Sequence, residues 1–136
     1  MKQKIIGLEN DFSAFVQYGR LILNCTEDEI KKHFPENQVT DLPGLDEDML
    51  LEIRLNQSTL TCLIDKKSGV CCAGFLFFDD EDLFNVYREV CNDRCEMIAP
   101  KVWKYDNYYI ELKESKDVGF YFAFGSEYNV LNELPC

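Results

Sequence analysis

The chain has 136 residues, a formal net charge of −11 and a sequence pI near 4.4. Its length suits one domain, and a hydrophobic content of 46% with 13% aromatic residues excludes disorder. The negative charge repels phosphate backbones and anionic lipids, so nucleic acids and membranes are poor partners. A basic protein would be attracted, although solubility alone explains an acidic surface equally well.

Cysteine usage indicates a reducing, cytoplasmic environment. The number of cysteines is odd, several lie in apolar runs where thiols behave as small hydrophobes, and the start Met1–Ile6 lacks the apolar run of a signal peptide. No stretch approaches the roughly 18 apolar residues of a membrane span. The cysteines are Cys25, Cys62, Cys71, Cys72, Cys91, Cys95 and Cys136.

The first part of the chain predicts two helices separated by a short strand. Apolar residues at helical spacing place the first helix within Leu8–Tyr18, with Gly19 able to end it, and Leu21–Leu23 reads as a strand. Thr26 and Glu29 form a capping-box pattern that opens the second helix. That helix must stop near Phe34, because Pro35 disfavours a helical residue before it.

The middle of the chain predicts a loop over Glu36–Asp48 and then a sheet. Alternation over Leu51–Leu55 is typical of a half-buried strand, and Lys66–Gly69 is a good hairpin turn between Thr59–Asp65 and Val70–Phe78. Since Val70–Phe78 is apolar at nearly every position, we expect a central strand with both faces covered.

The last part predicts a helix and two strands. Leu83–Cys91 has one apolar helical face and follows acids that favour a helix N-terminus. Strands follow over Val102–Lys113 and Val118–Phe124, joined by a turn at Glu114–Asp117. The fold class is therefore α+β: a single antiparallel sheet of about four to six strands with two or three helices on one face. Similar closing strands favour two α-β-β repeats, Glu27–Phe78 and Asp82–Phe124.

Catalytic motifs are not found. The single histidine, His33, suits the end of its helix, and no Gly-flanked serine elbow or glycine-rich phosphate loop exists. Cys91 and Cys95 lack the spacing of a zinc site, and Cys71 and Cys72 would point to opposite faces of a strand. We therefore expect no enzyme activity, no metal and no cofactor. Paired carboxylates of a small hydrolase stay open, because their separation is a structural quantity.

The outward face of the last hairpin is the predicted binding surface. If Phe120, Phe122 and Phe124 face the core together with Tyr108, Ile110 and Leu112, alternation places large aromatic side chains and one acid outside. Such residues are enriched among binding hot spots, although aromatic pairs on a sheet also simply pack. The predicted set is Trp103, Tyr105, Tyr109, Glu111 and Tyr121, with the acidic run Asp79, Asp80, Glu81 and Asp82 as a second contributor.

In its short length, its acidity and its lack of catalytic motifs, the chain resembles the small cytoplasmic immunity proteins of bacterial polymorphic-toxin and contact-dependent inhibition systems. The tandem helix–hairpin layout also looks like the β-lactamase-inhibitor-protein architecture, in which repeated α/β units present a concave sheet. The resemblance implies a protein that occludes a cognate toxin, often a nuclease or another basic enzyme. It carries no site residues over to this chain.

The leading hypothesis is a non-catalytic protein that binds and neutralises a partner protein, a basic toxin or enzyme. The alternatives are a homo-oligomeric structural or adaptor protein, whose aromatic face is a self-interface, and a small carboxylate-based hydrolase.

Overall fold

The computed structural model describes residues 15–43, 48–80, 82–117 and 119–126. In these ranges, three short helical elements precede four strands, and a fourth helical element precedes four more strands, so strands predominate. The helical elements are the 3-10 turn η1 (Phe15–Gln17), α2 (Tyr18–Ile22), α3 (Glu27–His33) and α4 (Leu83–Arg94). The strands are β1 (Val39–Pro43), β2 (Met49–Arg54), β3 (Ser58–Ile64), β4 (Cys71–Phe78), β5 (Glu96–Ala99), β6 (Val102–Tyr105), β7 (Tyr108–Ser115) and β8 (Gly119–Gly125).

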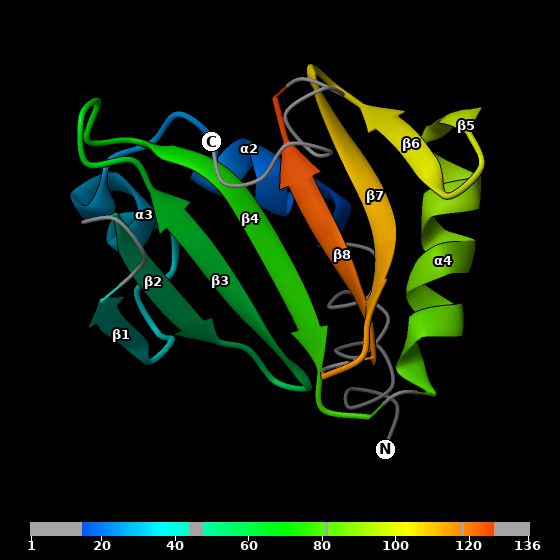
Figure 1. Ribbon diagram of the computed structural model, residues 1–136, viewed down its shortest axis with the longest axis horizontal. Helices are drawn as coiled ribbons and strands as arrows, with labels where there is room; N and C mark the ends of the chain where they lie inside the picture. The colour runs from blue at the N-terminus through cyan, green and yellow to red at the C-terminus, as the bar shows by residue number, and fades with distance from the viewer. Residues whose placement is uncertain (1–14, 44–47, 81, 118, 127–136) are drawn as a thin grey trace.

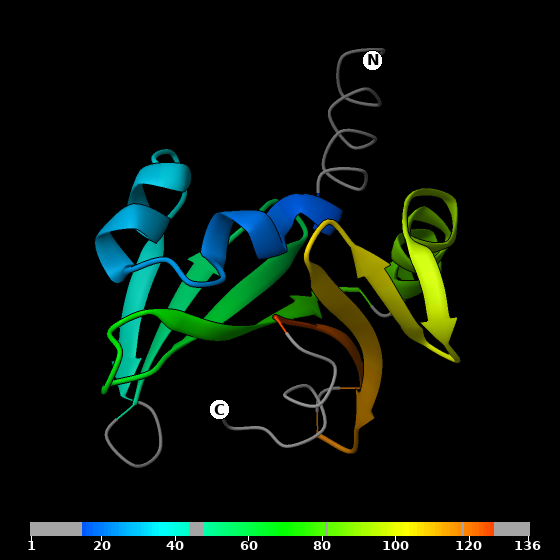
Figure 2. The ribbon, with the colours of Figure 1, turned by 90° about the horizontal axis from the view of Figure 1, so that it is seen from above.

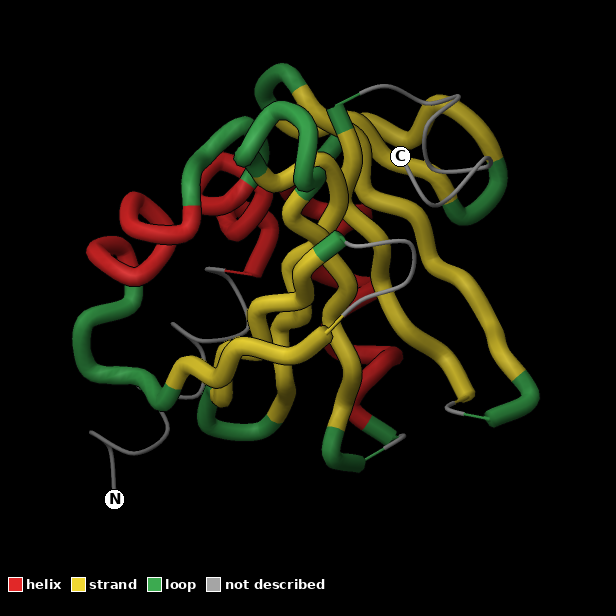
Figure 3. Tube along the Cα trace, turned by 60° about the vertical axis from the view of Figure 1, so that its left-hand side comes forward, coloured by secondary structure: helices red, strands yellow, loops and turns green. Residues whose placement is uncertain are grey.

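All eight strands form one sheet in the order β1-β2-β3-β4-β8-β7-β6-β5, with every neighbouring pair antiparallel. Each half of the sheet is a meander, and the two halves join where β4 lies beside β8 (Figure 1). Figure 3 shows the strands in yellow as one twisted, curved sheet. The sheet thus has its two edges at β1 and β5, far apart in space.

The described helices all pack on one face of the sheet (Figure 2). Phe15 of η1 lies at the centre of this layer, where its ring contacts Tyr87 of α4 and Phe122 and Phe124 of β8, with centroids 4.8, 5.3 and 6.4 Å away. Phe78 stacks on Tyr87 at 4.9 Å. The main hydrophobic core therefore lies between the helices and the central strands. No helix in the described part of the chain is long and apolar enough to cross a membrane.

The predicted fold class was wrong in its strand number and in its repeat. The sheet has eight strands, more than the four to six expected. Each half is one helix followed by four antiparallel strands, α3 with β1–β4 and α4 with β5–β8, so the halves are not α-β-β units. Three strands were not expected: β1, β5 and the second strand that arises because the stretch 102–113 is divided in two. Of these, β1 and β5 are short edge strands, and a short edge strand carries too few alternating residues to be distinguished from a loop.

Several local predictions were confirmed. Thr26 caps α3, because its Oγ1 accepts from the Glu29 N–H at 3.3 Å while the Glu29 carboxylate accepts from the Thr26 N–H at 2.9 Å. The helix ends at His33, one residue before Phe34. The hairpin between β3 and β4 turns at the predicted place, where Asp65 Oδ2 accepts from Ser68 Oγ at 3.0 Å.

Other local predictions were corrected. Leu21 and Ile22 belong to α2 and Leu23 is its C-cap, so Leu21–Leu23 is not a strand. The segment 36–48 contains β1 and is not a continuous loop. Most of the first predicted helix lies outside the described residues. The stretch 102–113 is interrupted by a two-residue turn at Asp106 and Asn107, and therefore forms two strands, β6 and β7.

Gly19 allows a close approach between the helix layer and the sheet. A Cβ atom at Gly19 would overlap the ring of Tyr108 on β7. This close packing also lets the Tyr108 hydroxyl donate a hydrogen bond to the Val16 carbonyl oxygen. Burial raises the pKa of Tyr108, so the phenol stays protonated as a hydrogen-bond donor. The missing side chain at position 19 thus fixes how η1 and α2 sit on β7.

Replacing Thr26 by alanine should lower the free energy of unfolding by about 1 kcal/mol, because the N-cap acceptor of α3 is lost. The cap also holds the pKa of Glu29 below its usual value, through the hydrogen bonds to Thr26. A lowered folded-state pKa stabilises the fold above the unfolded-state pKa, so this contribution should disappear as the pH falls through the carboxyl range. Urea denaturation of Thr26→Ala and the control Thr26→Ser at neutral pH measures the side-chain cap. Comparison of the parent chain with Glu29→Gln at neutral and acidic pH measures the contribution of the carboxylate, because the Thr26 N–H remains in both Thr26 variants. Equal stability of the two Thr26 variants would contradict the cap.

Replacing Gly19 by alanine should cost about 1–3 kcal/mol, because the new methyl group meets a rigid ring and moves it off the Val16 carbonyl. Gly74→Ala is the matched control, since the atom that its Cβ would overlap is the terminal Cδ1 of Ile22 rather than a ring. Thermal and urea unfolding of both variants should show the larger loss for Gly19→Ala. A larger loss for Gly74→Ala would show that the contact with Tyr108 is not limiting.

Candidate functional site

The face of the sheet opposite the described helices carries a cluster of aromatic rings at its centre. We call this side the open face. Phe75 and Phe77 of β4 and Tyr121 of β8 point to it, because they alternate with the buried Leu76 and Phe122. The ring centroids are 6.5 Å apart for Phe75 and Phe77, 6.3 Å for Phe75 and Tyr121, and 5.3 Å for Phe77 and Tyr121. All three residues are half-buried.

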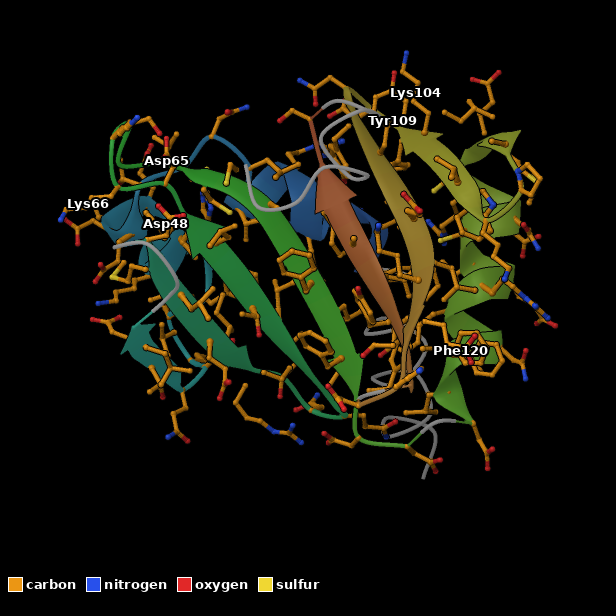
Figure 4. The ribbon with its side chains drawn as sticks, viewed as in Figure 1. Asp48, Asp65, Lys66, Lys104, Tyr109 and Phe120 are labelled. Carbon is orange, nitrogen blue, oxygen red and sulfur yellow. The ribbon has the colours of Figure 1, made fainter. Side chains whose placement is uncertain are left out.

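Beside the ring cluster, β7 adds a charged pair and a further tyrosine to the open face. Glu111 lies opposite Ala123 in the sheet, and Lys113 lies opposite Tyr121. Lys113 Nζ is 3.7 Å from Glu111 Oε2, while Glu111 Oε1 is buried and has no hydrogen-bond partner among the residues that the structure describes. Tyr109 lies farther along β7, next to Lys104 of β6 (Figure 4). The open face beside the rings therefore carries a polar pair as well as a phenol.

Tyr121 connects the ring cluster to this charged pair. Its pKa is raised above the usual value, first by burial and then by the negative charge of Glu111. The phenol therefore remains neutral and able to donate a hydrogen bond. A neutral ring with a polar tip, surrounded by other rings, can bury apolar area and still bind a polar group.

Three of the five predicted binding residues, Tyr109, Glu111 and Tyr121, lie together on the open face. The other two do not. Trp103 is 1% exposed and lies on the helix side, where its Nε1 donates to Asn92 Oδ1 at 2.9 Å. Tyr105 is also on that side, opposite Tyr108, with the Arg20 guanidinium 5.9 Å from the centre of its ring.

Trp103 and Tyr105 lie on the helix side because of the turn between β6 and β7. Alternation continues only within one strand, whereas a two-residue turn makes Tyr105 and Tyr108 cross-strand neighbours on the same face. Asp106 has a φ of 55°, the left-handed conformation that such turns require. Asp106 and Asn107 were therefore the sequence signal for the turn, because both residue types favour turns.

The predicted acidic run lies at the end of β4 and has structural roles in its described residues. Asp79 forms a bidentate ion pair with Arg54 of β2, with Arg54 Nη1 at 2.7 Å from Asp79 Oδ1. Asp80 Oδ1 accepts from the Asp82 N–H at 3.0 Å in the turn that leads into α4. Glu81 lies outside the described residues. Asp79 is therefore already paired with Arg54, and Asp80 and Asp82 belong to the turn that leads into α4.

The residues considered for catalysis or metal binding are dispersed. His33 Nδ1 donates to the Leu21 carbonyl oxygen at 2.7 Å and so links α3 to α2. Cys62, Cys71 and Cys91 are buried free thiols in the core, whereas Cys72 is disulfide-bonded, so the expectation of free thiols does not hold for Cys72. Among the residues that the structure describes, no group of three or more histidine, cysteine, aspartate or glutamate side chains could hold a metal ion.

Comparison with known proteins gives no match to a family model, to a curated protein or to a solved structure.

Two residues of the open face, Phe75 and Phe77, were not predicted. The strand Val70–Phe78 is apolar on both sides, a pattern typical of strands covered on both faces, yet no described helix covers the side with these two rings. The sequence signal for an exposed aromatic face was the run of Phe75, Phe77 and Phe78 directly before the acids Asp79 and Asp80.

Replacing Glu111 by glutamine should lower the pKa of Tyr121, because a neutral amide no longer opposes the phenolate charge. Burial, the larger cause, should keep that pKa above its usual value of 10.0. Titration of ¹³C-labelled tyrosine rings by NMR measures this. The control is Glu114→Gln, an exposed carboxylate opposite Phe120 rather than Tyr121. An equal shift in both variants would show that Glu111 has no specific effect.

Proposed function

We propose that the chain is a cytoplasmic, non-catalytic domain that binds another protein through its open face. The observation that supports this most directly is the cluster of Phe75, Phe77 and Tyr121 on a sheet face with no described helix over it. Aromatic residues supply much of the binding energy of protein interfaces, because they bury a large area and lose the freedom of only a few side-chain torsions.

The surroundings of the cluster also suit an interface. Glu111 and Lys113 lie beside the rings, with Lys113 Nζ 3.7 Å from Glu111 Oε2. A polar pair at the margin of an apolar cluster can fix the orientation of a complex.

The charge of the chain supports a basic partner. A net charge of −11 accelerates the encounter with a positively charged protein, and the aromatic cluster would then slow dissociation. An immunity protein that occludes a basic toxin or enzyme fits this combination. Self-association through the same face is the alternative that the test must exclude.

The test begins with capture of partners from the organism that encodes the chain and identification of a stoichiometric protein by mass spectrometry. The affinity of the purified partner is then measured for Phe77→Ala and Tyr121→Ala. Each should weaken binding at least about tenfold, as loss of a hot-spot ring does. The matched control is Phe84→Ala, a half-buried ring that stacks on Phe120 on the helix side, with centroids 4.5 Å apart.

Circular dichroism and urea denaturation of the three variants separate loss of binding from loss of folding. If Phe84→Ala weakens the complex as much as Tyr121→Ala does, the open face is not the interface. Sedimentation of the isolated chain at micromolar concentration checks the alternative, and a dimer broken by Tyr121→Ala would replace the proposed partner by a second copy.

A further inference from the structure

A second surface, on the helix side and at the β5 edge of the sheet, has different chemistry from the open face. A cleft of about 620 Å³ lies between the C-terminal half of α4 and the hairpin of β5 and β6. We call it the β5 cleft. Its volume is typical of sites that accept a ligand or a peptide side chain. Its lining includes Arg88, Asn92, Met97, Ile98, Lys101 and Trp103.

The apolar part of the β5 cleft is unusually exposed. Met97 is 54% and Ile98 is 42% exposed. Among the described residues, only Val86 is another large hydrophobic residue that is exposed to solvent. Trp103 lies directly across the strand pair from Met97, is itself 1% exposed, and is held by its hydrogen bond to Asn92. A fixed indole at the base and two exposed aliphatic side chains at the rim suit a bulky apolar group.

The charged part of the β5 cleft is positive, in contrast to the net charge of the chain. Arg88 and Lys101 line it, no carboxylate does, and neither cation is ion-paired with a described residue. The Arg88 guanidinium also donates to Asn85 Oδ1 at 3.1 Å and lies 5.7 Å from the centre of the Phe84 ring, contacts that leave its charge uncompensated. The nearby acid Glu96 is opposite Lys104, the β6 neighbour of Tyr109, so it belongs to the open face. Within an acidic protein, this local pair of cations favours an anionic ligand group.

The backbone beside the cleft offers a docking edge. In the described sheet, β5 is a terminal strand and pairs only with β6, so its other edge carries backbone groups that another strand can bind. The adjoining two-residue turn is formed by Pro100 and Lys101, and Lys101 has the positive φ of 64° that suits such a turn. The Lys101 carbonyl oxygen accepts from the Leu112 N–H at 2.9 Å, which ties the turn to β7.

We propose that the β5 edge binds an extended, acidic peptide segment of a partner protein. The segment adds a strand beside β5, places a bulky apolar side chain over Trp103 in the β5 cleft, and sets a carboxylate against Arg88 and Lys101. Main-chain pairing supplies affinity, and the cleft with its two cations supplies the sequence preference. This goes beyond the proposed function, because the partner chemistry is opposite in charge and the surface is on the other side of the sheet.

Trp103 makes the proposal directly measurable, because it is the one tryptophan in the chain and lies at the base of the cleft. The probe is a short acetylated peptide in which leucine and valine alternate with glutamate. Titration should give a saturable change in tryptophan emission. The control is the same peptide with lysine at every glutamate position, which the net charge of −11 would attract if long-range charge decided binding.

Charge-reversal variants locate the peptide. Lys101→Glu should weaken binding of the glutamate peptide at least about tenfold, the size expected for losing and reversing a charge contact. Lys104→Glu is the matched control, because Lys104 is an exposed lysine one strand position from Trp103 that does not line the cleft (Figure 4). Hydrogen exchange of the 96–99 backbone should also slow when the peptide is bound.

The proposal is overturned if the emission does not change up to millimolar peptide, or if the lysine peptide binds as tightly as the glutamate peptide. It is equally overturned if Lys104→Glu weakens binding as much as Lys101→Glu does. A self-associated chain that Lys101→Glu converts to a monomer would assign the edge to a second copy instead. None of these results depends on Phe77 or Tyr121, so failure here is distinct from failure of the open-face proposal.

Discussion

The pairing of β4 with β8 holds the two halves of the protein together. Their register runs from Ala73 opposite Gly125 to Phe77 opposite Tyr121, and it joins two meanders that are otherwise consecutive in the chain. This pair lies at the centre of the sheet, so both surfaces depend on it. On the helix side it aligns Leu76 with Phe122 under the η1 layer, and on the other side it brings Phe77 against Tyr121.

The one-sided position of the helices follows from the short segment that begins with Phe15. Its ring contacts α4 and β8 simultaneously, and the Tyr108 hydroxyl bonds to the backbone one residue beyond it. The described helices thereby form a single layer on one face. The opposite face retains aromatic side chains that pack mainly against one another. Residues with apolar neighbours on one side only are suited to recognition, because their remaining surface is available without unfolding.

Local chemistry was the part of this structure that could be predicted from sequence. The hydrogen bonds between Thr26 and Glu29 span three residues, so the pattern alone specifies them. The alternation within β7 likewise placed Tyr109 and Glu111 correctly relative to the buried Ile110. Such features depend on few residues that are close in the chain, and no tertiary contact can easily reverse them.

Nonlocal pairing could not be predicted in the same way. Alternation does not reveal that β8 pairs with β4, and the unrecognised turn at Asp106 moved Trp103 to the wrong face. The same turn decided the content of the candidate site, because it separated the aromatic side chains into two surfaces. Phe75 and Phe77 belong to the open face because the described helices cover only the opposite side of the sheet, and this one-sided arrangement is a tertiary feature. The β5 cleft depends on contacts between α4 and the hairpin of β5 and β6, and it had no counterpart in the sequence pattern.

The place of β8 has a consequence for synthesis of the chain. Residues 119–125 fill the middle of the sheet but are made after every other described strand. Until they emerge from the ribosome, β4 and β7 both present unpaired backbone edges and uncovered apolar side chains, a state that favours aggregation or capture by chaperones. The nascent protein therefore cannot complete its core from the N-terminus onward. The sheet becomes continuous only when β8 pairs with β4 on one side and β7 on the other.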